Sequence, residues 1–183
     1  LIDTTSTERR TRALLAAVEA HTGGAPVRTV INTHWHGDHT NGNCLLPEAT
    51  VIAHGGCRDD VARGRIGGLA GIWDPVEWGD LVVRPPDLVF HDRVELRVGG
   101  IDVEVRHPGH SAHTDDDCVV WLPGPRVLFT GDLVFHGGTP FVLMGSVRGS
   151  LRAIDWMRSF DADVVVPGHG PVCNIDVLDD IEE

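Results

Sequence analysis

The sequence predicts a mixed α/β fold, in which strands and helices alternate along the chain. Apolar, β-branched runs of strand length occur at residues 27–31 and 50–53. Residues 94–105 alternate between apolar and charged side chains on either side of Gly99-Gly100, which predicts a β-hairpin with a two-residue turn. With 183 residues, of which 42% are hydrophobic, the chain fits a single domain over residues 1–183.

The first element after the N-terminal strand end at residues 1–4 is a helix. Thr5 and Glu8 have the spacing of a capping box, and the helix is expected to run to about residue 20. Gly23-Gly24 then ends it. Its core-facing side chains are Leu14, Leu15 and Val18. A short second helix is expected at residues 57–63.

The first candidate metal-binding motif is His-Trp-His-Gly-Asp-His at residues 34–39, directly after the strand at 27–31. Neutral imidazole and carboxylate are the usual ligands of zinc and related divalent metals. On an extended loop His34 and His36 point to the same side, because side chains alternate with a period of two. Gly37 lets the chain turn and direct the next two residues to a second point, so the spacing suits two adjacent metals. Those two residues are Asp38 and His39.

The His-x-His-x-Asp-His pattern resembles the signature of the metallo-β-lactamase superfamily, as do the flanking residues 32–33 and 41–43. The resemblance implies a four-layer αββα sandwich, in which two sheets pack face to face and helices cover the outside. It also implies that an acid corresponding to Asp3 lies beneath the loop. In the family an N-terminal β-hairpin normally precedes the strand that matches residues 1–4, and this chain is expected to lack it.

The resemblance places the other metal ligands in three later motifs, each at a strand end. His113, followed by Thr114 and a strand at 118–122, fits the family register for the first of them, and His110 is the competitor. The acids at 115–117 are expected to be loop residues rather than ligands. The strand at 127–132 and the turn after 164–166 end in the remaining two ligands, Asp132 and His169.

The ligand set implied by the resemblance divides between two divalent metal ions, expected to be zinc, with iron or manganese as alternatives. The first ion would take His34, His36 and His113, and the second would take Asp38, His39 and His169. Asp132 would bridge the two ions, and the cysteine that some relatives carry at this position is absent. The implied centre is therefore dinuclear, with room for water at each metal.

The function implied is that of a metallohydrolase, which uses a metal-bridging hydroxide on a small acyl substrate such as a thioester, a lactone or a β-lactam. Asp38 is expected to take a proton during the reaction. Two alternatives use the same residues: an iron-dependent redox enzyme such as a persulfide dioxygenase, and a non-catalytic metal-binding module. The irregular, glycine-rich segment 64–78, with Trp73 and Trp78, is expected to select the substrate.

The composition of the chain limits the kinds of binding partner that are expected. The net charge of −12 disfavours nucleic acid, because phosphate binding needs clustered basic residues. No apolar run approaches the roughly 20 residues that span a membrane. The four cysteines are scattered, which indicates free thiols, and a cytoplasmic location is expected. The oligomeric state is open at this point.

Overall fold

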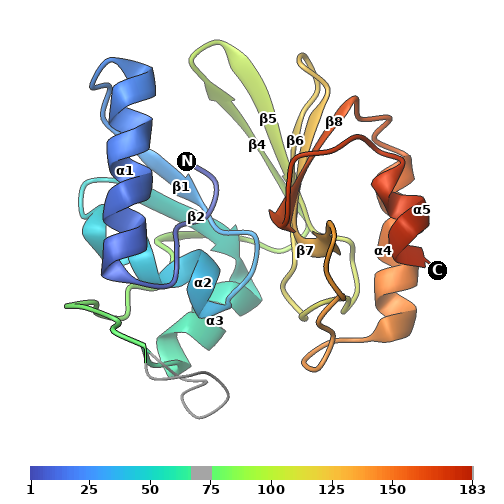
Figure 1. The fold of residues 1–183 in the computed structure, drawn as a ribbon, viewed down its shortest axis with the longest axis horizontal. Coiled ribbons are helices and arrows are strands. Elements are labelled where there is room, and N and C mark those ends of the chain that lie inside the picture. Colours follow the sequence, from blue (N-terminus) through green and yellow to red (C-terminus); the bar gives the residue numbers. More distant parts are fainter. Residues whose placement is uncertain (67–75, 183) are drawn as a thin grey trace. The chain divides into compact units, whose positions relative to one another are not determined.

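The computed structural model describes residues 1–66 and 76–182 of the chain. The chain forms two compact units, Leu1–Val89 and Phe90–Glu183, each with its own sheet and helices. Figure 1 shows the first unit in blue to green and the second in yellow to red. The predicted mixed α/β class is confirmed. No helix in the described part of the chain is long and apolar enough to cross a membrane.

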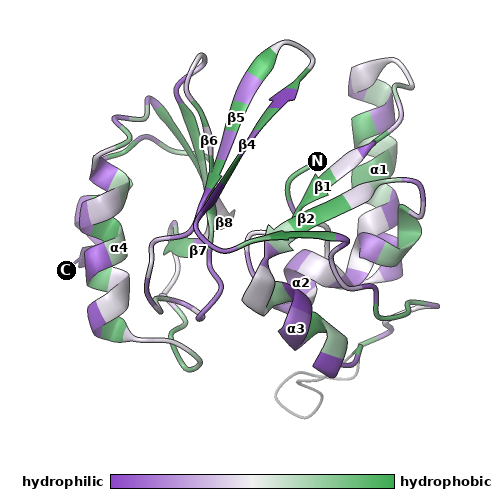
Figure 2. Ribbon diagram, turned by 180° about the vertical axis from the view of Figure 1, so that it is seen from behind, coloured by the Kyte–Doolittle hydropathy of each residue, from purple (hydrophilic) through white to green (hydrophobic). Residues whose placement is uncertain are grey.

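The first unit contains a three-stranded sheet with the order β1-β2-β3. Its strands are β1 (Thr29–Ile31), β2 (Thr50–His54) and β3 (Leu88–Phe90). Strands β1 and β2 pair in parallel, and the N-terminal residues extend the sheet beyond β1 through a bridge between Ile2 and Ile31. Strands β1 and β2 are strongly hydrophobic in Figure 2, as expected for strands that are buried on both faces.

Helices surround the sheet of the first unit: α1 (Glu8–Thr22), α2 (Gly37–Thr40), the 3₁₀ helix η1 (Asn41–Leu45) and α3 (Gly55–Arg63). The predicted cap of α1 at Thr5 is wrong. Thr7 has the extended backbone of an N-cap, and its hydroxyl accepts a hydrogen bond from the Arg10 N–H. The Thr5 hydroxyl instead bonds that of Thr11 at 2.8 Å. The predicted end of α1 is confirmed, with Gly23 in the left-handed conformation.

The second unit contains a five-stranded sheet in which neighbours follow the chain order. Its strands are β4 (Arg93–Val98), β5 (Ile101–Arg106), β6 (Val119–Leu122), β7 (Val127–Phe135) and β8 (Val164–His169). The predicted hairpin is confirmed, because Gly99 and Gly100 both have positive φ, as the two-residue turn between β4 and β5 requires. Strands β4 to β7 pair antiparallel, whereas β7 and β8 are parallel.

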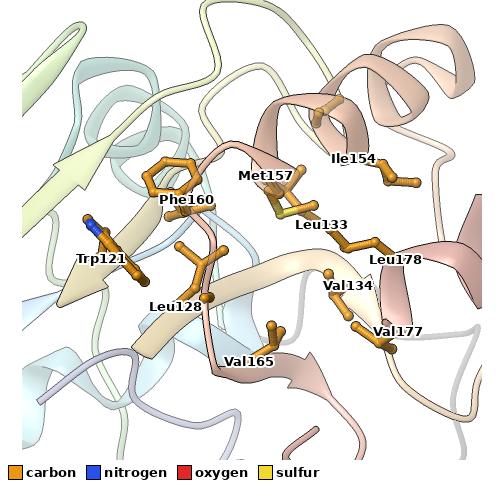
Figure 3. Packing of buried hydrophobic residues seen from close by; sticks show 14 residues of the cluster. Trp121, Leu128, Leu133, Val134, Ile154, Met157, Phe160, Val165, Val177 and Leu178 are labelled. Carbon is orange, nitrogen blue, oxygen red and sulfur yellow. The ribbon is translucent and has the colours of Figure 1, made fainter. Parts of the chain in front are cut away.

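Two helices, α4 (Val147–Arg158) and α5 (Val177–Glu182), pack against β7 and cover the main core of the second unit. Figure 3 shows Ile154 and Met157 of α4 among the side chains of β7 and α5. Helix α4 was not predicted from the sequence. Its signals are present, since Ser146 caps the helix and its buried side chains recur at helical spacing. All four cysteines are free thiols, as predicted.

Candidate metal centre

The first unit gathers four of the predicted ligands directly after β1. The predicted loop is correct for His34 and His36 only, because Asp38 and His39 lie in the short helix α2. The His34 ring lies 4.7 Å from that of His36 and 4.2 Å from that of His39, measured between centroids. The Nε2 atom of His39 is 3.6 Å from the Oδ2 atom of Asp38. The three imidazoles are buried, whereas the Asp38 side chain is 42% exposed. The loop therefore presents three buried imidazoles and one accessible carboxylate.

Asp3 holds this loop from below, as the sequence predicted. Its carboxylate accepts hydrogen bonds of 2.8 Å from the backbone N–H and the hydroxyl of Thr33. It also bonds Nδ1 of His39 at 2.8 Å. An imidazole that donates its Nδ1–H to a carboxylate keeps Nε2 as the basic nitrogen, which is the usual arrangement for a histidine metal ligand. Asp3 therefore fixes both the orientation and the tautomer of His39.

In the second unit, three predicted ligands from distant parts of the chain meet at one carboxylate. The Oδ2 atom of Asp132 lies 3.5 Å from Nε2 of His113 and 3.3 Å from Nε2 of His169. Asp132 follows Gly131, which has a φ of 52°, at a shift in the register between β7 and β8. Such bulges change the direction in which a strand residue points. This irregularity places a carboxylate between two imidazoles.

His113, rather than His110, occupies the position beside Asp132. The His113 ring is buried, and its Nδ1 bonds the backbone carbonyl of Phe141. This bond again leaves Nε2 as the atom that faces Asp132. His110 is only partly buried, and its Nδ1 contacts the carbonyl of Ser111 at 3.1 Å. His113 therefore remains the predicted ligand.

The backbone of β8 lies directly against the Asp132 carboxylate. A Cβ atom on Gly168 would be 2.0 Å from Oδ1 of Asp132 and 2.6 Å from the carbonyl carbon of Gly131. The neighbouring His169 stacks on Phe135, with ring centroids 5.1 Å apart and planes inclined by 18°. Glycine at 168 is therefore needed for the close approach that brings His169 to Asp132, a requirement that the sequence analysis missed.

The turn after His113 contains a buried acidic group that the sequence analysis treated as loop acids. Asp116 and Asp117 are both buried. The Thr114 hydroxyl lies 2.5 Å from Oδ1 of Asp116 and 2.7 Å from Oδ1 of Asp117, and the Thr114 N–H donates to Asp117. Burial raises the pKa of Asp117 to about 7. These two acids hold the turn that presents His113, whereas Asp115, in the same loop, is exposed.

The spacing of the donor atoms fits metal coordination. In a tetrahedral zinc site with bonds of about 2.0–2.2 Å, neighbouring ligand atoms are about 3.3–3.6 Å apart. The three donor pairs described within the units are separated by 3.3, 3.5 and 3.6 Å. Direct N–H···O hydrogen bonds are shorter, usually 2.7–3.2 Å. Each unit thus carries histidine and aspartate side chains that could bind metal ions.

Comparison with known proteins identifies the class. The sequence pattern of the metallo-beta-lactamase superfamily matches residues 1–169, so the chain belongs to this superfamily. A metallo-beta-lactamase from Pontibacter korlensis has the same fold, with a TM-score of 0.77 and 26% sequence identity. That match covers 100% of this chain and 79% of the other. The predicted family fold is confirmed.

Two curated relatives are similar to this chain in sequence. A hydroxyacylglutathione hydrolase of Methylococcus capsulatus is 30% identical over 138 residues, which is 75% of this chain and 45% of the relative. A metallo-beta-lactamase type 2 of Bacillus cereus is 29% identical over 180 residues, which is 94% of this chain and 62% of the relative. The chain thus spans about half to two thirds of the length of these relatives, both of which are named as hydrolases or lactamases.

Proposed function

We propose that this chain is a metal-dependent hydrolase of small acyl substrates. The observation that carries the proposal is the position of the Asp132 carboxylate, whose Oδ2 atom lies at ligand–ligand distance from two histidines on separate segments. An oxygen that lies this close to two separate imidazoles can be a ligand to the metal ion of each, which suits Asp132 to a position between two ions. Family membership supports the same conclusion, because the matched region includes all seven candidate ligands.

The proposed centre divides the seven candidate ligands between two ions, and we propose that residues 1–183 are one domain. Support comes from the family pattern, which runs through both units without a break. One divalent ion, expected to be zinc, would be held by His34, His36 and His113. The other would be held by Asp38, His39 and His169, and Asp132 would be shared by both. The donor set of imidazole and carboxylate suits zinc, and it also accommodates manganese or iron.

When bound, two such ions supply a nucleophile from water near neutral pH and polarise the carbonyl of the substrate. The residues of the chain provide the rest. Asp3 and the Phe141 carbonyl hold the rings of His39 and His113, so that no reorganisation is needed during the reaction. Asp38 has an accessible carboxylate on the same loop, and we assign it the proton that the leaving group requires.

The substrate class that the structure favours is an acyl compound with an apolar part. Phe141, whose carbonyl bonds His113, begins a short segment with three exposed apolar side chains, of which Leu143 is 80% exposed. The others are Phe141 and Met144. Of the segment expected to select the substrate, residues 67–75 with Trp73 lie outside the described part, and Trp78 is half-buried. By their names, the relatives act on an acyl-glutathione compound and on β-lactams.

The test combines metal analysis with a hydrolysis screen over a thioester, a lactone and a chromogenic cephalosporin. We expect two equivalents of metal per chain and hydrolysis of at least one substrate, lost with a chelator and restored by zinc. Asp132→Asn should lose metal and activity, because an amide is a poor bridging ligand. Asp163→Asn, which changes an exposed acid paired with Arg126 in the same unit, is the control. Metal-free protein, or an Asp132→Asn variant that keeps both ions, would overturn the proposal.

A further inference from the structure

A buried hydrogen-bond network lies beneath residues 34–39, here called the metal loop, and ends at the backbone of His39. The His39 carbonyl accepts hydrogen bonds from the Asn32 side-chain amide at 2.9 Å and from the Thr4 hydroxyl at 3.0 Å. The amide of Asn43 in turn donates to Oδ1 of Asn32 at 2.8 Å. Asn32 and Asn43 are both fully buried. His39 is therefore held at two points, its ring by Asp3 and its peptide by this network.

Arg84 holds the far end of the same network. Its guanidinium group donates to the backbone carbonyls of Asn43 at 3.0 Å and Ala49 at 2.7 Å, and also to that of Leu46. The carbonyl of Arg84 accepts a hydrogen bond from the Asn43 amide at 3.3 Å. Asp87 pairs with the same guanidinium at 3.0 Å. Both the backbone and the side chain of Asn43 are thus tied to a residue about forty positions further along the chain.

Burying Asn32 and Asn43 costs more free energy than burying two apolar side chains would, because both amides must be desolvated and all their hydrogen bonds satisfied. What the network provides is a fixed orientation of the His39 peptide. The His39 carbonyl belongs to α2, which has only four residues and gives little local rigidity. Fixed donors on that carbonyl determine how the helix is rotated, and therefore where the His39 ring and the neighbouring Asp38 point. Outer residues of this kind orient the ligands that touch a metal.

We propose that Asn43 is a positioning residue for the metal loop, acting through Asn32 on His39, and that Arg84 keeps Asn43 in place. This inference rests on the proposed metal centre. It assigns the segment around Arg84, which contains no candidate ligand, a part in setting metal affinity and ligand geometry in the first unit.

The first test is Asn43→Asp, which preserves the shape of the side chain and removes its amide donor. The full chain is titrated with Co²⁺, and the affinity and the visible absorption spectrum at saturation are recorded. We expect about 10–100-fold weaker binding, the usual effect of losing an outer partner of a metal ligand. We also expect a changed spectrum, because it reports ligand geometry. Asn174→Asp, at an exposed amide of the second unit, should behave as wild type.

The second test is Arg84→Met, which keeps the aliphatic part of the side chain and deletes the donors. Because it lies one step further from His39, we expect the same spectral change with a smaller loss of affinity, about tenfold or less. Arg126→Met removes a guanidinium that holds two acids, Asp161 and Asp163, in the second unit, and is the matched control. This pair keeps the inference testable if Asn43→Asp does not fold.

The outcomes separate the two proposals. A wild-type chain that binds no Co²⁺ would overturn the proposed function. A wild-type chain that binds Co²⁺, together with a folded Asn43→Asp or Arg84→Met variant of unchanged affinity and spectrum, would overturn only this inference. A variant that is less stable without metal but has the wild-type spectrum at saturation would show a purely structural role, and it would also overturn the inference.

Discussion

The two units build their parts of the candidate metal centre in different ways. In the first unit, four candidate ligands lie within the six residues 34–39, so one loop after one strand brings them together. In the second unit, three candidates come from a turn before β6, from β7 and from the end of β8. Their convergence depends on the pairing of β7 with β8. The first arrangement is local and visible in the sequence, whereas the second is a product of the sheet.

The largest expected effect is the loss of metal affinity when His113 is replaced, which tests whether His113 is a metal ligand together with Asp132 and His169. A structural zinc site with four ligands contributes about 10–16 kcal/mol, so one ligand corresponds to about 3 kcal/mol. His113→Ala should therefore weaken metal binding by more than about hundredfold. His110→Ala should leave it nearly unchanged, because His110 contacts Ser111 and is partly exposed. Competition titration with a zinc chelator measures both. The reverse result would move the ligand to His110.

A smaller effect should follow from breaking the contact between β7 and β8. In Gly168→Ala the new methyl would lie 2.0 Å from Oδ1 of Asp132, and the nearby backbone cannot yield easily. We expect the free energy of unfolding to fall by about 1–3 kcal/mol, as is typical of overpacking, together with weaker metal binding. Denaturant unfolding without and with zinc measures the two effects separately.

The control for this prediction is Gly138→Ala, a glycine of the same unit whose added methyl meets no atom within 4 Å and whose φ is not positive. It should change neither stability nor metal binding appreciably. Equal behaviour of the two alanine variants would show that β8 shifts freely, and that the geometry at Asp132 does not depend on glycine at 168.

The difference between the two units also explains which features could be predicted from the sequence. The strand positions, the β4–β5 hairpin and the loop at 34–39 follow from local patterns, and each was predicted. Thr5 and Thr7 are two residues apart and are both capable caps, so the choice depends on the fold around Thr11. The need for glycine at 168 arises from a contact between distant segments, which no local pattern encodes.

The smallest expected effect concerns the turn that presents His113. The Thr114 hydroxyl has one proton but lies within 2.7 Å of oxygens on both Asp116 and Asp117, so one of these contacts requires a further proton. Burial raises the pKa of Asp117 to about 7, above its ordinary value of 3.8. The folded state therefore binds this proton more tightly than the unfolded state does. Stability due to this group falls as the pH rises from about 4 to about 7 and is constant above that.

Asp117→Asn should remove this pH-dependent loss, because the amide is neutral and can donate to the Thr114 hydroxyl while its oxygen accepts the Thr114 N–H. We expect the metal-free variant to be more stable than the parent at pH 8, with little difference at pH 4. Urea unfolding in the presence of a chelator measures this gap at both pH values. Asp115→Asn, at the exposed acid of the same turn, should show no such pH dependence. A gap of equal size at both pH values would mean that Asp117 is ionised in the folded chain throughout this range, and that the turn before β6 is held by charge rather than by a shared proton.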